Sequence, residues 1–174
     1  MTDLSWLIAR PIAHRGFHDK NRTRWENTLS AFDAAIERDY AIECDSHLSS
    51  DGVPVVIHDD DLKRLTGEDG FVWQRTAAEL GAMRIGGTED HVPTLEEVLA
   101  RIGGRVPVVV EVKGTPGRDA GLVERVGKQL TRYQGKAAIM SFDHWLIRDF
   151  SKYAPGIPGG LTAYGRDNAL IEAH

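Results

Sequence analysis

Short apolar segments that alternate between strand-like and helix-like spacing run along this sequence. We predict strands where short apolar runs are bounded by turn residues, and helices where apolar residues recur every three to four positions. The predicted strands cover residues 8–14, 41–47, 53–58, 106–113 and 137–142, with a sixth starting at 159–163, and the predicted helices cover 28–38, 94 onward, 120–133 and 144–153. Repeated strand-then-helix units are typical of the α/β class.

Two architectures are built from such units: a TIM-type (β/α) barrel and an open doubly wound sheet. The fingerprint G-x-G-x-x-G, which is typical of dinucleotide-binding doubly wound sheets, does not follow the first predicted strand. We therefore favour the barrel, in an incomplete form with about six of the usual eight strands. At 174 residues the chain is expected to form a single domain, residues 1–174.

Residues 59–92 separate the third predicted strand from the next helix and are polar and glycine-rich, with a weak helical pattern at 76–80. We interpret this segment as a surface insertion. The helix that follows has a clear start, because Thr94 can cap it and Glu97, three residues later, completes a capping box.

Composition excludes several classes of protein. The net charge of −5 argues against nonspecific nucleic-acid binding, which normally needs a basic face. No apolar run reaches the roughly 18 residues of a membrane span, and the first residues lack the pattern of a signal peptide. We therefore expect a cytoplasmic protein without membrane insertion. The lone Cys44 cannot form an internal disulfide and is interpreted as a buried thiol.

Three carboxylates fall inside predicted strands. Glu43 and Asp45 are two residues apart, so both project from one face of their strand, and Glu111 and Lys113 do likewise. Three converging carboxylates repel one another unless neutralised, and an all-oxygen set suits a hard cation such as Mg²⁺ or Ca²⁺ better than zinc. The alternative, that these acids are surface or ion-paired residues, fits poorly with their apolar neighbours.

His14 and His58 close two of the predicted strands. One imidazole can take a proton from a nucleophile while the other protonates the departing oxygen, because the pKa of histidine lies near neutrality. Arg15 and Lys113 are candidates for phosphate contacts, with ordinary salt bridges as the alternative. His47 is either a pocket residue or a solvent-facing one. We interpret the other histidines as packed or solvated residues: His18, His91, His144 and His174.

Taken in order, several short motifs resemble the signature of the glycerophosphodiester phosphodiesterase family. They are His14-Arg15-Gly16, Glu26-Asn27-Thr28, Glu43-x-Asp45, Asp51-Gly52 with Val55-Val56-x-His58-Asp59, Pro93-Thr94-Leu95-Glu96-Glu97, Glu111-x-Lys113 and Ser141-Phe142-Asp143. Each motif is weak alone, but the ordered series is highly specific. Ser49, where the family usually has Thr, and Trp25, where it often has Pro, are modest departures.

The resemblance implies a TIM-type barrel that hydrolyses small-molecule glycerophosphodiesters to sn-glycerol 3-phosphate and an alcohol, using one divalent cation, Mg²⁺ or Ca²⁺. The roles that it implies are metal binding by Glu43, Asp45 and Glu111, acid–base catalysis by His14 and His58, and phosphate or site-shaping contacts by Arg15, Lys113 and Asn27. The nucleophile stays open between water and the glycerol hydroxyl of the substrate.

Two further hypotheses remain. Because the family's barrel has eight strands and about six are predicted here, the chain is alternatively a catalytically impaired, truncated fragment that binds metal and phosphate. Exposed strand edges would then favour a homo-oligomer or a swapped assembly. A third hypothesis keeps the enzyme but makes its substrate a lysophospholipid or a sphingolipid phosphodiester.

Overall fold

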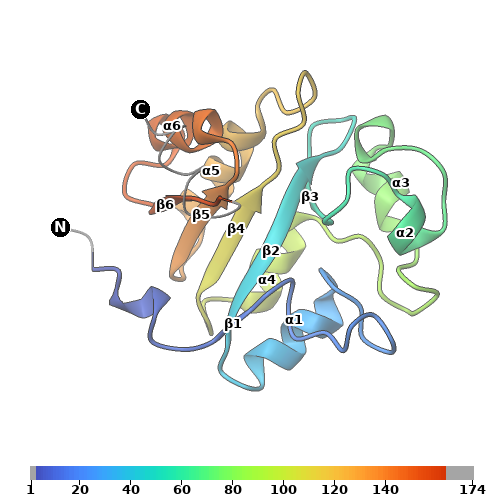
Figure 1. The fold of residues 1–174 in the computed structure, drawn as a ribbon, viewed down its shortest axis with the longest axis horizontal. Helices are drawn as coiled ribbons and strands as arrows, with labels where there is room; N and C mark the ends of the chain where they lie inside the picture. The colour runs from blue at the N-terminus through green and yellow to red at the C-terminus, as the bar shows by residue number, and fades with distance from the viewer. Residues whose placement is uncertain (1–2, 164–174) are drawn as a thin grey trace.

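The computed structural model describes residues 3–163, and Figure 1 shows a twisted sheet flanked by helices. Of the residues singled out above, His174 lies outside this range. The elements are, in chain order, η1 (Ser5–Leu7), β1 (Ile12–Ala13), α1 (Leu29–Ile36), β2 (Ala41–Leu48), β3 (Pro54–Val56), α2 (Lys63–Thr66), η2 (Val72–Gln74), α3 (Ala77–Gly81), α4 (Leu95–Ile102), β4 (Val108–Val112), α5 (Leu122–Arg132), β5 (Ala137–Ser141), α6 (His144–Tyr153) and β6 (Gly159–Leu161).

Five of these strands are parallel, in the order β1-β2-β4-β5-β6, and β3 is antiparallel to β2. This topology confirms the α/β class and the repeated strand-helix units. Most predicted helices and strands differ from the observed ones by only a few residues at their ends. The Thr94–Glu97 capping box is present at the start of α4. In the described part of the chain, no helix is long and apolar enough to cross a membrane.

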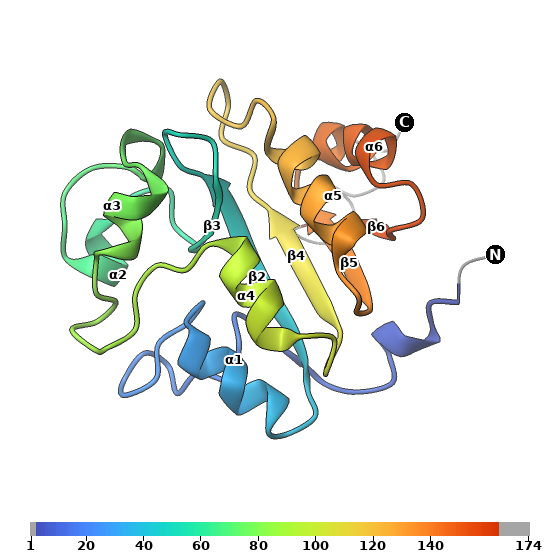
Figure 2. The ribbon, with the colours of Figure 1, turned by 180° about the vertical axis from the view of Figure 1, so that it is seen from behind.

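The two faces of the sheet have different chemistry. On the face covered by α1, α4, α5 and α6, apolar strand residues form the main core, and Figure 2 shows α4 and α5 lying over the strands. The strand residues of this core include Ile42, Cys44, Val108, Val110, Val112 and Ile139. Cys44 is buried, as expected, and this burial raises the pKa of its thiol. Because side chains alternate along a strand, the intervening acids project from the opposite face.

The predicted strand over residues 8–14 is wrong for most of its length. Only Ile12 and Ala13 pair with β2, and Ile8 is 89% exposed. Pro11 explains the late start, since it offers no backbone donor and restricts the residue before it. The preceding turn η1 instead places Trp6 against Val109 and Ala138. Trp6 therefore packs on β4 and β5, away from the main core.

The third predicted strand forms as β3, but it is not a parallel barrel strand. The short Asp51-Gly52 turn joins β2 to β3, and Gly52 has a φ of +75°. So short a connection can only join antiparallel strands, because a parallel pair needs a crossover of about a dozen residues or more. The backbone amide of Ile57 then donates to the carbonyl of Asp45 over 3.1 Å. His58 therefore returns to the level of Asp45.

Residues 59–92 pack around a small apolar cluster of their own. Its members are Val55 and Ile57 from the β3 region together with Leu62, Leu65, Val72, Leu80, Ile85 and Val92. The helical pattern predicted at 76–80 corresponds to α3, which begins with a Thr76–Glu79 capping box. Figure 1 shows α2 and α3 beside β3 at one end of the sheet. Trp25 packs against this cluster and lies over Gly86.

Gly16 allows the loop after β1 to approach α1 closely. It has a φ of +80°, and a Cβ atom added there would lie 2.8 Å from the Cβ of Ala31 and 3.0 Å from the ring of Phe32. Gly67 is a matched control, because its φ is +81° but no atom would lie within 4 Å of an added Cβ.

We expect Gly16→Ala to destabilise the protein more than Gly67→Ala does. A positive φ costs an alanine roughly 1–2 kcal/mol at either position, and overpacking adds about 1–3 kcal/mol at Gly16 only. Chemical denaturation of both variants measures the two losses in the free energy of unfolding. Equal losses would contradict the close approach of this loop to α1.

Candidate active site

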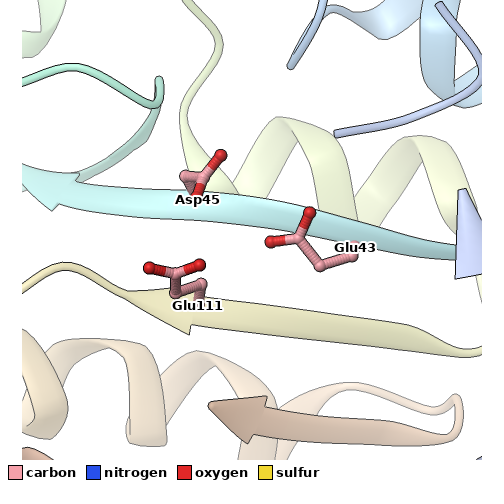
Figure 3. A group of neighbouring side chains, drawn as sticks. All are labelled: Glu43, Asp45 and Glu111. Carbon is pink, nitrogen blue, oxygen red and sulfur yellow. The ribbon is translucent and has the colours of Figure 1, made fainter. Parts of the chain in front are cut away.

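Three carboxylates meet on the face of the sheet opposite the main core. Glu43 and Asp45 come from β2 and Glu111 from β4, and the register pairs Asp45 with Glu111. One oxygen atom of each lies within 4.8 Å of the others, and all three side chains are buried. Figure 3 shows the carboxylates gathered over neighbouring strands. The structure thus brings together the three residues that the sequence suggested as metal ligands.

Burial and mutual repulsion both disfavour negative charge in this cluster. Burial, together with the charges of Asp45 and Glu111, raises the pKa of Glu43 to about 8. Glu43 Oε2 accepts a hydrogen bond of 2.9 Å from the backbone amide of Arg15, but its buried Oε1 has no hydrogen-bond partner. An unpartnered carboxylate oxygen beside two further carboxylates is the donor set that a hard divalent cation prefers. The residues present therefore fit Mg²⁺ or Ca²⁺.

Two basic side chains flank the carboxylates. Lys113 Nζ lies 2.5 Å from Glu111 Oε1 and 2.9 Å from Asp45 Oδ1. Burial opposes the charge of Lys113, but Asp45 and Glu111 outweigh it and raise the pKa of the ammonium group. Arg15 Nε lies 3.4 Å from Asp45 Oδ2. Both residues thus form salt bridges within the site, and their contact with phosphate stays a prediction.

Asn27 fixes the orientation of Asp45. Its Nδ2 donates to Asp45 Oδ2 over 2.8 Å, and its Oδ1 accepts from the Asp45 backbone amide over 3.3 Å. The backbone of Asn27 in turn donates to the carbonyl of Arg15. Both Asn27 and Arg15 adopt a positive φ, +56° and +57°. Such conformations cost energy and cluster at functional sites.

The two histidines singled out from the sequence reach the site differently. His14 follows β1, is largely exposed, and places Nε2 4.0 Å from Glu43 Oε2. Burial and the charge of Arg15 lower the pKa of His14. His58 arrives through β3, and its Nδ1 lies 2.7 Å from Asp59 Oδ1. His47 is buried, and its Nε2 lies 3.0 Å from the backbone carbonyl of His58.

A cavity of about 550 Å³ opens at the carboxyl ends of β4 and β5, beside the carboxylates. One part of it is lined by residues 111–114, which include Glu111 and Lys113. The rest is lined by residues of the β5–α6 junction: Ser141, Phe142, Asp143, His144 and Trp145. His144, interpreted from the sequence as packed or solvated, thus borders this cavity. The volume lies in the range of small-molecule sites.

Two acids that the sequence left without a role support the site. Glu26 is buried and its Oε1 lies 3.0 Å from Nη1 of Arg15. Asp59 contacts His58, as described above. Glu26 precedes Asn27 in the sequence and Asp59 follows His58. This adjacency to candidate site residues is the sequence signal that could have identified the two acids. Arg64, which contacts both acids, had no such signal because it lies in the segment interpreted as a surface insertion.

Parallel strands that present acids, histidines and basic residues at their carboxyl edge have the architecture of TIM-barrel enzymes. The family model described as the glycerophosphoryl diester phosphodiesterase family matches residues 14–172. The chain belongs to this family.

Curated relatives include glycerophosphodiester phosphodiesterases of two bacteria. That of Caldanaerobacter subterraneus subsp. tengcongensis is 37% identical over 160 residues, covering 86% of this chain and 65% of the relative. That of Bacillus altitudinis is 33% identical over 165 residues, covering 86% and 64%. The chain therefore spans slightly less than two thirds of the length of these relatives.

Solved structures of the same kind share the fold. A phosphodiesterase of Oleispira antarctica, in complex with the product sn-glycerol-3-phosphate, superposes with a TM-score of 0.84 at 26% identity, covering 94% of this chain and 70% of that one. A glycerophosphodiester phosphodiesterase of Thermotoga maritima gives a TM-score of 0.70 at 30% identity, covering 94% and 66%. The TIM-type architecture is thereby confirmed, and residues 3–163 contain five of its parallel strands together with the antiparallel β3.

We expect a divalent cation to stabilise the protein through these carboxylates. At a free cation concentration of 100 times the dissociation constant, the gain is about 2.7 kcal/mol, which for a domain of this size raises Tm by roughly 5–10 °C. Glu43→Gln keeps the shape of the side chain but removes the charge, so it should abolish most of the response. Thermal melts of both proteins with Mg²⁺, with Ca²⁺ and with chelator measure this shift in Tm.

Glu124→Gln is the control for this experiment, because Glu124 pairs with Lys128 on the surface of α5. It should keep the full response to the cation. A cation-dependent rise in Tm that survives in Glu43→Gln would place the ion elsewhere.

Proposed function

We propose that the chain hydrolyses glycerophosphodiesters to sn-glycerol 3-phosphate and an alcohol, with one divalent cation, Mg²⁺ or Ca²⁺. The observation that carries the proposal is the buried cluster of three carboxylates flanked by Lys113 and Arg15. Family membership and the product bound by the Oleispira antarctica relative support the choice of substrate. A cytoplasmic location and self-association over the sheet edges belong to the same proposal.

The charges in the cluster favour a phosphodiester. Glu43, Asp45 and Glu111 contribute three negative charges when ionised, and Arg15 and Lys113 contribute two positive ones. A divalent cation held by the three carboxylates would offset most of their negative charge, and the cation together with Arg15 and Lys113 would attract the negative charge of a phosphodiester. When bound, the cation would polarise a phosphoryl oxygen. Arg15 and Lys113 would contact the nonbridging oxygens, and Asn27 would hold Asp45 in place.

His14 and His58 would divide the proton transfers. One imidazole takes a proton from the nucleophile as the new P–O bond forms. Water as the nucleophile gives sn-glycerol 3-phosphate directly, whereas the glycerol hydroxyl gives a cyclic phosphate that a water molecule opens in a second step. The other gives a proton to the alcohol oxygen as the bond between that oxygen and phosphorus breaks. The hydrogen bond between His58 Nδ1 and Asp59 leaves Nε2 of His58 available for transfer.

We expect His58→Ala to lower turnover of glycerophosphocholine by about 10²–10⁴-fold, the usual contribution of general acid–base catalysis. The measurement is the release of sn-glycerol 3-phosphate by the purified 174-residue chain with Mg²⁺ or Ca²⁺, and with chelator. His91→Ala is the matched control, because His91 lies near Glu97 at the start of α4 and has no role in the site. Its turnover should stay within about twofold of wild type.

The outcomes separate the hypotheses. Cation-dependent turnover that disappears in His58→Ala supports the proposal. Cation binding without turnover by the wild-type chain favours a catalytically impaired form that binds metal and phosphate. Turnover of a lysophospholipid or sphingolipid phosphodiester but not of glycerophosphocholine would change the substrate class.

A further inference from the structure

Arg64 lies on α2, within residues 59–92, and its guanidinium group spans two carboxylates. Nε lies 2.6 Å from Asp59 Oδ2 and Nη2 lies 2.9 Å from Asp59 Oδ1. On the other side, Nη2 lies 2.7 Å from Glu26 Oε1 and Nη1 lies 3.1 Å from Glu26 Oε2. Each acid is therefore held by two hydrogen bonds, the fork geometry that only an arginine provides.

Each of these acids contacts a residue of the proposed catalytic machinery. Asp59 Oδ1, which accepts from Arg64, also lies 2.7 Å from Nδ1 of His58. Glu26 Oε1 accepts a hydrogen bond of 3.0 Å from Nη1 of Arg15. Two continuous chains of hydrogen bonds thus run from one guanidinium group, one to an imidazole and one to a phosphate-binding candidate.

The surroundings hold Arg64 and its partners in place. Leu62 and Leu65, on either side of Arg64 in the sequence, are fully buried in the apolar cluster of residues 59–92. Glu26 is additionally fixed by Asn21, whose Nδ2 donates to Glu26 Oε2 over 2.6 Å. Because this packed cluster fixes the backbone of Arg64, it also fixes the place where the guanidinium group holds the two carboxylates.

Both acids are held in the ionised form. The hydrogen bond from Arg64 lowers the pKa of Asp59 to about 2. Burial opposes ionisation of Glu26, but the hydrogen bonds from Arg64 and Asn21 outweigh it and lower the pKa of Glu26 to about 2. Asp59 and Glu26 therefore act as hydrogen-bond acceptors across the neutral pH range.

We propose that Arg64 is a positioning residue, which holds Asp59 and Glu26 and through them orients the imidazole of His58 and the guanidinium group of Arg15. Residues 59–92 thereby contribute to the active site through Asp59, which contacts His58, and through Arg64, which touches no reacting atom. The effect on turnover rests on the function proposed above, whereas the effect on the geometry of His58 does not.

Nuclear magnetic resonance of ¹⁵N-histidine-labelled protein tests the geometry without any turnover. The imidazole signals of His58 are assigned by their loss in His58→Gln. We expect Arg64→Gln and Arg64→Lys to move these signals toward those of a freely exposed histidine. Arg84→Gln, which changes an exposed arginine of the same segment, should leave them in place. Unchanged His58 signals in a folded Arg64 variant would overturn the proposal.

A double-mutant cycle tests the consequence for turnover of glycerophosphocholine. We expect Arg64→Gln and Asp59→Asn each to lower kcat by about 10- to 100-fold, the usual effect of residues that orient site ligands. The double variant should lose less than the product of the two single losses, because both changes break the chain of contacts to His58, while Arg64→Gln alone also breaks the chain to Arg15. Arg84→Gln should keep wild-type kcat.

Arg64→Lys keeps the charge and the apolar stem, so it separates orientation from stability. A lysine cannot hold both acids in a fork, and we expect kcat to stay low in this variant. Full recovery of kcat by Lys, or additive losses in the cycle, would overturn the proposal. If the wild-type chain shows no turnover, the proposed function fails, and the His58 signals alone decide the role of Arg64.

Discussion

The mutual repulsion of three buried carboxylates is the constraint on which the rest of this structure depends. Glu43, Asp45 and Glu111 lie within a few ångströms of one another and largely out of contact with water. Like charges in such surroundings are unfavourable unless they are neutralised. Lys113 and Arg15 neutralise part of the charge through Asp45 and Glu111. Glu43 receives one backbone hydrogen bond and its Oε1 has no partner, so its raised pKa marks the place where a cation could replace the proton.

The fold tolerates this cluster because the sheet separates its two kinds of face. The valines and isoleucines of β2, β4 and β5 pack beneath the helices and supply the apolar burial. The acids alternate with them and face the other side, next to the loops that bring Arg15, Asn27 and Lys113. The antiparallel return of β3 adds His58 at the same level. Stability and the proposed chemistry therefore use alternate residues of the same strands.

Much of this organisation could be predicted from the sequence, because apolar spacing decides element type and residue spacing in a strand decides which side chains share a face. Glu43, Asp45 and Glu111 converge as that reasoning predicts. The direction of β3 could also have been predicted, since Asp51-Gly52 is a hairpin signal. The predicted first strand extends too far because Pro11 delays strand pairing until Ile12. Arg64 was missed because its partners, Glu26 and Asp59, are brought to it only by the packing of residues 59–92.

The most direct test of this account is the electron density of crystals grown with Ca²⁺, or with Mn²⁺ in place of Mg²⁺ for its anomalous signal. The account predicts one ion bound by oxygen atoms of Glu43, Asp45 and Glu111 at about 2.0–2.6 Å. An ion bound elsewhere, or carboxylates that remain bridged only by Lys113 and Arg15 at saturating cation, would contradict it.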